Sequence, residues 1–404
     1  MSMDSDSREG WPPVADEELP WISAIPVELV SRSVREELAL PYRAAVVPAL
    51  ADVDARLPRR VAAAAEEASA IVREFDADLG GDLAPFAAIL LRSESASSSQ
   101  IENLTSGAKQ IALAELGEQA RRNATEIVGN VHAMRAAIAL SERLDADAIL
   151  QMHRALMLET DPEQAGRWRT EQVWIGGGGY SPHRAAFVPP HADRVPAAMA
   201  DLVAFLSRTD IPPLPHAALA HAQFETIHPF ADGNGRTGRA LVHAVLRKRG
   251  LTRRLTVPIS AGLLTDTRGY FDALTAYRAG DPSVIVDVMA AAAQEAVVNG
   301  RQLATDLGGL RTDWTSRIRA RSDAAVWPLI DLVLRQPVVN TAIVQETLGI
   351  SHTNAMKAIN HLVDAGVLSQ IGGRRRSILW QASHVLAALD AFAARAGRRV
   401  VGAG

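Results

Sequence analysis

Apolar residues recur every three to four positions over residues 36–160, and charged residues separate them. This is the period of an amphipathic helix, so we predict a largely helical stretch, with one helix over residues 61–75 and another that begins at Pro85. The same pattern returns at residue 194 and continues to about residue 300, with breaks at the prolines near 212 and 258. Residues 1–20 are acidic and polar and contain prolines, which predicts a flexible lead-in.

Two segments depart from the helical period. Residues 171–175 and 186–188 read as short strands, and the glycines between them at 176–179 indicate a hairpin with a long loop over residues 171–190. Residues 301–322 are rich in arginine and predict a linking helix. A new unit then begins, over residues 323–390.

In this last unit Asn340 can cap a short helix, Gly349 makes a turn, and Ser351 can cap a second helix. Two strands follow, over residues 367–371 and 377–380, with a basic tip between them. Helix, turn, helix and hairpin in this order are typical of a winged helix-turn-helix domain.

Composition limits the class of protein. The 404 residues suffice for two or three domains, and 48% of them are apolar. The net charge of −4 argues against a chain that binds nucleic acid over its whole surface. There is no cysteine, which excludes disulfides and thiolate metal sites. We find neither a long apolar span nor a signal peptide, so we expect a cytoplasmic protein without a membrane segment.

The segment from Gly233 to Gly238 matches the dinucleotide-binding pattern of three glycines, but that pattern requires a buried strand before it. Here residues 216–227 read as a helix. The glycines still precede a helix start, where free backbone N–H groups and the helix dipole bind anions. Arg236 and Arg239 lie three residues apart on nearly one helix face, an arrangement that suits a polyphosphate.

Two further side chains complete the segment. Asp232 would repel phosphate unless a cation lies between them, and Mg²⁺ is the usual one. His228 can act as a general base at neutral pH. The alternative is a structural helix–loop–helix, in which the glycines and Asn234 cap and the arginines are solvated.

The run from His228 to Arg239 resembles the signature of the Fic (filamentation induced by cAMP) family, H-P-F-x-[D/E]-G-N-G-R-x-x-R, at every fixed position. The resemblance extends over about residues 90–300. It implies a mainly α fold: a helical Fic core over residues 116–300 with a β-hairpin flap, preceded by a helical region over residues 21–115 and followed by the winged helix-turn-helix domain.

The resemblance also implies an activity, the transfer of AMP from ATP to a Ser, Thr or Tyr hydroxyl of a protein. His228 would take the proton of the hydroxyl, and Asp232 would hold Mg²⁺. ATP would be bound by Gly233, Asn234, Gly235, Arg236, Arg239 and, through the looser match at 266–277, Tyr270. The flap would align the target protein through Val173, Trp174, Ile175 and Phe187.

Ser98, Glu102 and Asn103 resemble the family's inhibitory motif, [S/T]-x-x-x-E-[G/N], placed before the catalytic segment as in class II members. The resemblance implies an inhibitory helix at about residues 96–108, in which Glu102 pairs with Arg239 and competes with the γ-phosphate of ATP. The carboxylate and the γ-phosphate would compete for one guanidinium, and in a partly buried site such an ion pair can be worth a few kcal/mol. The alternative is a surface helix with Glu102 in water.

The C-terminal unit carries residues that could contact DNA, namely His352, Asn354, Lys357, Arg374, Arg375 and Arg376. Winged-helix domains also serve in protein contacts. Two further alternatives stay open: a DNA-binding regulator that senses nucleotide, and a Fic-type enzyme that uses another nucleotide donor or removes AMP. The expected partners are ATP and a target protein, which could be the chain itself, and a homodimer is a further expectation.

Overall fold

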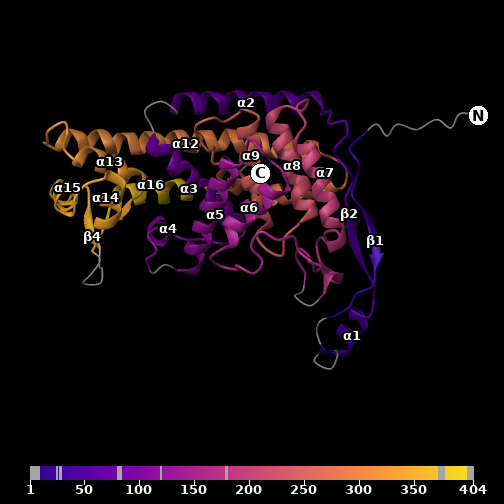
Figure 1. Ribbon diagram of the computed structural model, residues 1–404. Coiled ribbons are helices and arrows are strands. Elements are labelled where there is room, and N and C mark those ends of the chain that lie inside the picture. The colour runs from indigo at the N-terminus through magenta and orange to yellow at the C-terminus, as the bar shows by residue number, and fades with distance from the viewer. Residues whose placement is uncertain are drawn as a thin grey trace, which may run out of the picture. The chain divides into compact units, whose positions relative to one another are not determined.

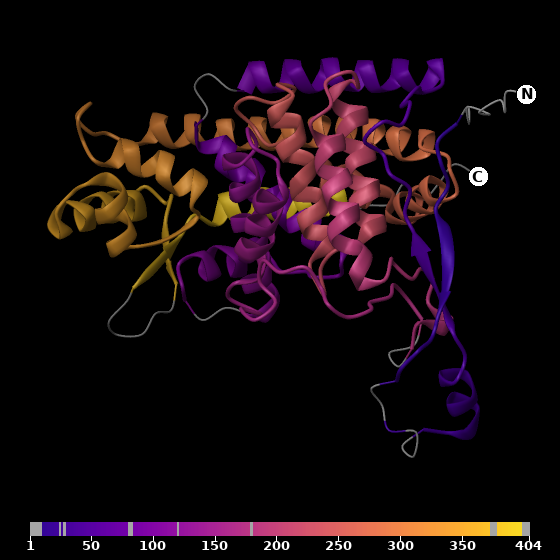
Figure 2. The same cartoon turned by 45° about the vertical axis from the view of Figure 1, so that its right-hand side comes forward.

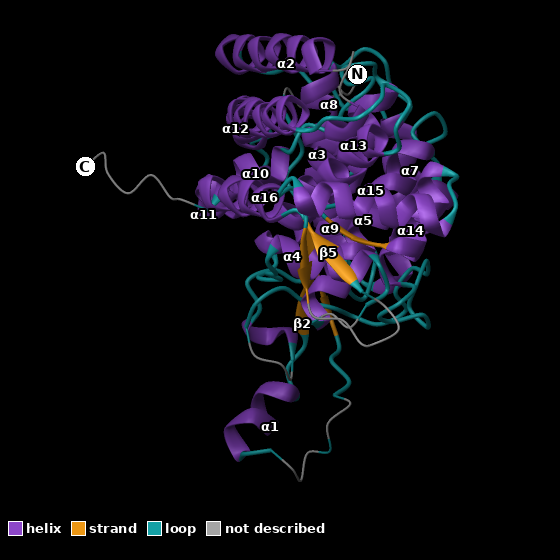
Figure 3. Ribbon diagram, turned by 90° about the vertical axis from the view of Figure 1, so that its left-hand side faces the viewer, coloured by secondary structure: helices purple, strands orange, loops and turns teal. Residues whose placement is uncertain are grey.

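The structure is a computed structural model that describes residues 10–23, 26, 30–79, 84–118, 121–177, 181–371 and 378–397. Helices dominate these residues and the few strands are short, as Figure 3 shows, which confirms a mainly α fold. The chain divides into two compact units. The first comprises Met1–Glu66, Ala136–Arg249 and Arg268–Met289, and the second comprises Glu67–Arg135, Gly250–Thr267 and Ala290–Gly404.

The first unit is built around a helix that is buried on all sides. This helix, α8 (Pro213–Ile227), is buried at every residue from Leu214 onward, and its alanines let neighbouring helices approach closely. Helices α7 (Val195–Leu206) and α9 (Asn234–Lys248) lie beside it (Figure 1). The unit also contains α6 (Ala146–Met157) and α11 (Thr267–Arg278), with short 3₁₀ turns at Pro182–Arg184 and Ala192–Arg194.

A two-stranded ribbon opens the chain. Strand β1 (Ala15–Leu19) pairs antiparallel with β2 (Tyr42–Val46), and α1 (Arg32–Leu38) lies beyond the end of this ribbon (Figure 2). The expected flexible lead-in is therefore wrong for residues 15–19. Strand β1 is acidic and mostly exposed, so its sequence looks like that of a flexible segment, whereas its partner β2 is largely buried.

In the second unit, α3 (Ala84–Ile101) packs against α10 (Ile259–Leu263), α13 (Val326–Arg335) and α16 (Ser383–Ala396), while α16 also packs against α4 (Ala108–Glu115). Arg92 of α3 pairs with Glu115 at 2.7 Å and donates to the carbonyl of Arg335 at 2.7 Å. A 3₁₀ turn at Leu264–Asp266 follows α10. Helix α3 and the C-terminal segment therefore share one core.

Three long helices are α2 (Arg59–Leu79), α5 (Arg122–Ala139) and α12 (Ser283–Arg317). The expected separate linking helix at 301–322 is wrong, because α12 continues through residue 301 and ends at Arg317. Leu303, Leu307 and Trp314 are buried at spacings of four and seven, so one helix face stays in the core past the point where we placed a boundary. In the part of the chain that is described, no helix is both long and apolar enough to cross a membrane.

The C-terminal segment contains β3 (Val338–Asn340), α14 (Thr341–Leu348), α15 (His352–Asp364), β4 (Ser369–Ile371) and β5 (Leu379–Gln381), with antiparallel strand order β3-β5-β4. The side chains of Asn340 and Ser351 accept backbone N–H bonds at the starts of α14 and α15, which confirms both predicted caps. The strands are shorter than expected. Arg374, Arg375 and Arg376 lie outside the described residues.

Candidate active site

The phosphate-binding candidate is the turn that joins α8 to α9. His228 ends α8 in a left-handed conformation, with φ of 50°, and Gly233 precedes α9 with φ of 75°. A Cβ at Gly233 would lie 2.8 Å from Leu156 Cδ2 of α6, so both the backbone angle and the close approach require glycine. The turn therefore presents beside the histidine the N-terminus of α9, whose first N–H groups have no partner within the helix.

Two side chains hold this turn from inside. Asn234 accepts from the backbone N–H of Phe230 and donates to its carbonyl, both at 2.8 Å. The buried Phe230 ring stacks on His153 of α6 at 3.6 Å. Because Gly166 N–H donates to Nδ1 of His153, its Nε2 carries the proton and donates to the carbonyl of Asp232 at 3.1 Å. This role of His153 depends on partners that are distant in the sequence, and it was not predicted.

His228 is set up as a neutral base. Its side chain is 19% exposed, and its Nδ1 lies 3.9 Å from Glu225, beyond hydrogen-bond distance. Desolvation by burial, helped by the positive charges of Arg169 and Arg278, lowers the pKa of His228 to about 3. The ring is therefore unprotonated at neutral pH and can accept a proton. Anionic phosphates bound nearby would raise that pKa toward the range useful for catalysis.

The two arginines of the segment are buried on α9, each 3% exposed. Asp232 is different: its carboxylate is 69% exposed and lies 3.3 Å from Arg236. One exposed carboxylate at a phosphate site is the protein ligand that Mg²⁺ commonly uses, with substrate oxygens completing its shell. No group of three His, Cys, Asp or Glu among the described residues could hold a metal by itself. The residues present fit a metal that is shared with a phosphate ligand.

Among the described residues of the expected hairpin over 171–190, the strand pairing is reduced to one antiparallel bridge, between Ile175 and Phe187. The strand expectations over 171–175 and 186–188 are therefore too long. The return segment is instead tied to the N-terminal ribbon, because Ala45 N–H donates to the carbonyl of Val188 at 3.0 Å. Arg278 lies over the Phe187 ring at 3.7 Å, and Trp174 contacts Trp21 edge to face. The four expected flap residues thus lie on a short, partly paired segment.

Tyr270, expected at the adenine pocket, is a core residue in this structure. Its hydroxyl is 2.8 Å from Nε2 of the buried His221, and the two rings stack at 5.9 Å. Burial, together with the nearby charge of Arg239, lowers the pKa of His221 to about 3, so this histidine is neutral and structural. A direct contact of Tyr270 with ATP stays a prediction.

Residues 143–246, which span α6 to α8, the turn just described and most of α9, match the Fic/DOC family. The chain carries a Fic domain. It is 37% identical over 112 residues to the protein adenylyltransferase fic-1 of Caenorhabditis elegans, a match that covers 27% of this chain and 20% of that protein. It is 36% identical over 113 residues to the protein adenylyltransferase Fic of Nematostella vectensis, which covers 27% of this chain and 24% of that protein.

The chain thus spans about a fifth to a quarter of the length of these curated relatives. A solved Fic family protein from Desulfovibrio desulfuricans matches over 83% of this chain and 98% of its own, with a TM-score of 0.51 and 23% identity. At this identity the likeness shows a shared fold. The match extends well beyond the Fic domain, so the helical regions that flank it belong to the same architecture.

The candidate inhibitory segment belongs to the second unit, and in the sequence it precedes residues 143–246, which match the Fic/DOC family. The helix expected over 96–108 is wrong beyond residue 101, because α3 ends at Ile101 and Glu102 lies in the turn that follows. Asn103 has φ of 63°, a conformation that glycine and asparagine tolerate best. This angle gives a physical reason why Gly or Asn follows the glutamate in the motif. Ser98, one helical turn before Glu102, is buried.

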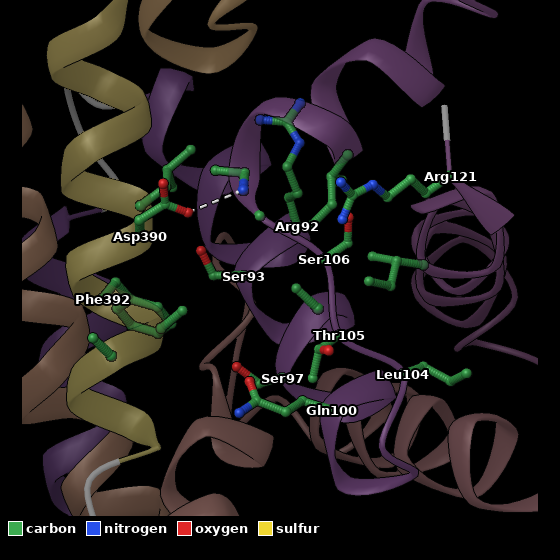
Figure 4. A pocket seen from close by; sticks show the side chains of 18 residues that line it. Arg92, Ser93, Ser97, Gln100, Leu104, Thr105, Ser106, Arg121, Asp390 and Phe392 are labelled. Carbon is green, nitrogen blue, oxygen red and sulfur yellow. Dashed lines mark hydrogen bonds between the residues drawn. The ribbon is translucent and has the colours of Figure 1, made fainter. Parts of the chain in front are cut away.

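A cavity of about 470 Å³ adjoins this turn (Figure 4). Ser97 and Gln100 of α3, Thr105 of the following loop, and Asp390 and Phe392 of α16 line it. Asp390 accepts the backbone N–H of Ala108 at 3.0 Å, the bond drawn in Figure 4. The start of α4, which follows the loop after Glu102, is therefore bonded to α16.

Of the residues expected to contact DNA, the described ones share one feature. His352, Asn354 and Lys357 are all exposed on α15, while Ala355 and Ile359 of the same helix are buried. The polar face of α15 is therefore available to a partner. The three arginines expected at the tip of the wing lie outside the described residues.

Proposed function

We propose that this chain is a protein adenylyltransferase that transfers AMP from ATP to a Ser, Thr or Tyr hydroxyl of a protein. The observation that carries the proposal is the α8–α9 turn, where a neutral His228 adjoins the N-terminus of α9 and its two buried arginines. The names of the relatives that match this segment support it.

In the proposed reaction His228 takes the proton of the target hydroxyl, whose oxygen attacks the α-phosphorus of ATP. The bond from that phosphorus to the bridging oxygen breaks, and pyrophosphate leaves. Backbone N–H groups at the start of α9, with Arg236 and Arg239, stabilise the charge that develops on the phosphates. Asp232 would hold Mg²⁺, which neutralises phosphate charge when bound. The flap, over residues 171–190, would present the target by backbone pairing.

We further propose that Glu102 restrains the reaction by competing with the γ-phosphate of ATP for Arg239. The support is the motif itself and the left-handed Asn103 that follows the glutamate. In a partly buried site such competition is worth a few kcal/mol, and about 1.4 kcal/mol corresponds to a factor of ten. Removal of the carboxylate should therefore raise transfer about 10- to 1000-fold.

The test compares wild type, Glu102→Gly, His228→Ala and the double variant, each incubated with ATP labelled in the α-phosphate, alone and with cell lysate. Label on protein should increase in Glu102→Gly and disappear when His228 is also replaced. Equal labelling of wild type and Glu102→Gly would contradict inhibition by Glu102. Label that survives His228→Ala would reject the proposed base.

We also propose that the C-terminal segment binds duplex DNA through the exposed polar face of α15, which carries His352, Asn354 and Lys357. DNA contacts of this kind weaken steeply as salt rises, because bound counterions are released. A gel-shift titration with duplex DNA at several salt concentrations tests this proposal. It compares the wild type with a triple variant in which His352, Asn354 and Lys357 are replaced by Ala. A shift that persists unchanged in that variant, or no shift at low salt, would contradict it.

A further inference from the structure

Arg169 makes an unusual set of contacts in the first unit. Its Nε donates to the carbonyl of His228 at 2.8 Å, its Nη1 to that of Glu171 at 3.0 Å, and its Nη2 to that of Pro190 at 2.5 Å. Its backbone N–H also donates to the carbonyl of Pro229 at 2.9 Å. One side chain therefore joins the end of α8 to two separate points of the flap.

The guanidinium is buried, since Arg169 is 4% exposed, and no carboxylate among the described residues forms an ion pair with it. Burial lowers the pKa of Arg169 to about 10, so it stays charged at neutral pH. A buried charge without a counter-ion is costly unless hydrogen bonds satisfy it. Here backbone carbonyls do so, which means that displacing any of the three segments leaves the charge less well satisfied.

The three carbonyls share a geometric role. Glu171 lies where the chain enters the flap, Pro190 lies where it leaves, and His228 is the proposed base. Gln172 adds a second tie across the flap base, because it donates to the carbonyl of Pro189 at 2.9 Å and accepts from the hydroxyl of Tyr42 at 3.1 Å. The base of the flap is therefore fixed, while the described residues of its distal part form a single bridge, between Ile175 and Phe187.

Only an arginine suits this position. The planar guanidinium presents donors in fixed directions, so three carbonyls can be served at once, whereas a lysine ammonium is a point charge on a flexible stem. The residue thus sets the spacing between the flap, which would carry the target, and the imidazole, which would receive its proton.

We propose that Arg169 is a positioning residue that holds the flap and His228 in register for the transfer. This inference rests on the proposed function, but part of its test does not depend on activity. A group that aligns two reactants contributes to the chemical step rather than to nucleotide binding, and misplacement by about 1 Å can cost about a hundredfold in rate.

The test uses Arg169→Lys and Arg169→Met, each made in the Glu102→Gly chain, with Arg32→Met as the control. Arg32 is 92% exposed and pairs only with Glu36 of its own helix among the described residues. Both Arg169 variants should lower kcat for AMP transfer about 10- to 100-fold, while the Kd for ATP changes by less than about threefold. The control should match its parent.

Hydrogen exchange provides the reading that is independent of activity. The amides of Ile175 and Ala186 are bonded across the flap at 2.8 Å. In both Arg169 variants, peptides that cover residues 171–177 and 185–190 should exchange at least about tenfold faster, and peptides from α6 and α7 should not change. If the Glu102→Gly parent itself transfers no AMP, the proposed function fails, and the exchange data still decide whether Arg169 fixes the flap.

A pH profile separates charge from geometry. The positive charge of Arg169 helps to hold the pKa of His228 low. The acidic limb of the rate profile should therefore move to higher pH in Arg169→Met, but not in Arg169→Lys, which keeps the charge. Unchanged flap exchange, an unchanged kcat, or loss of ATP binding in parallel with lower thermal stability would each overturn the proposal.

Discussion

The side chain of Asn234 makes a sharp prediction about how the phosphate-binding turn is held. Its amide makes two buried hydrogen bonds, both to the backbone of Phe230 and both 2.8 Å long. Substitution by alanine removes both bonds and leaves the N–H and carbonyl of Phe230 buried without these partners. Each such group costs about 1–3 kcal/mol, so the folded turn should lose about 2–6 kcal/mol.

That loss is large beside a typical unfolding free energy of about 5–15 kcal/mol. Urea denaturation of Asn234→Ala should show it, and calorimetry should show ATP binding weakened by at least about tenfold, because the N–H groups at the start of α9 are no longer aligned. Gln164→Ala is the control, since it removes an exposed amide side chain and should change stability by less than about 0.5 kcal/mol.

Asn234→Asp sharpens the test. It keeps an oxygen for the N–H of Phe230 but places a carboxylate oxygen where the donor to the Phe230 carbonyl was, so it should cost at least as much as alanine. If Asn234→Ala lies within about 0.5 kcal/mol of wild type and binds ATP equally well, the reasoning about this turn is refuted.

Two further predictions concern packing and pH. A Cβ at Gly238 would lie 2.9 Å from Phe224 and 3.1 Å from His221, whereas one at Gly308 of α12 meets nothing within 4 Å. Gly308→Ala, the control, should therefore stabilise the chain by up to about 1 kcal/mol. Gly238→Ala should be about 1–3 kcal/mol less stable than Gly308→Ala. Equal melting temperatures of the two variants would contradict the close packing of α8 and α9. Burial lowers the pKa values of His153 and His216 to about 4, and those of His221 and His228 to about 3. Below pH 6.5 the unfolded chain therefore binds more protons than the folded chain, and the free energy of unfolding decreases as the pH is lowered. Each contributes a loss of up to about 2 kcal/mol between pH 6.5 and 5, and His221→Phe should flatten this dependence in urea titrations; an unchanged slope would show that His221 is not the buried neutral group described here.

The sequence predicted the parts of the site that are local. The helix before His228, the glycine turn and the start of α9 follow from residues within a dozen positions of one another, and so do the caps at Asn340 and Ser351. Such features depend on backbone preferences that neighbouring residues set.

Features that depend on distant partners were missed. Strand β1 is stabilised by β2, which a helix separates from it along the chain, and its own residues are polar. Arg169 is one of 42 Lys and Arg residues, and its role depends on three carbonyls that only the folded chain brings together. The end of α3 at Ile101 was missed because nothing in a run of serines before it marks a stop, whereas the left-handed angle at Asn103 does.

The position of the transferred phosphorus tests the central claim most directly. The Glu102→Gly chain is incubated with target lysate and with ATP labelled either in the α-phosphate or in the γ-phosphate, and protein-bound label is measured. Transfer of AMP predicts label on protein from α-labelled ATP and none from γ-labelled ATP. Label from the γ-phosphate alone would show phosphoryl transfer and would contradict the account.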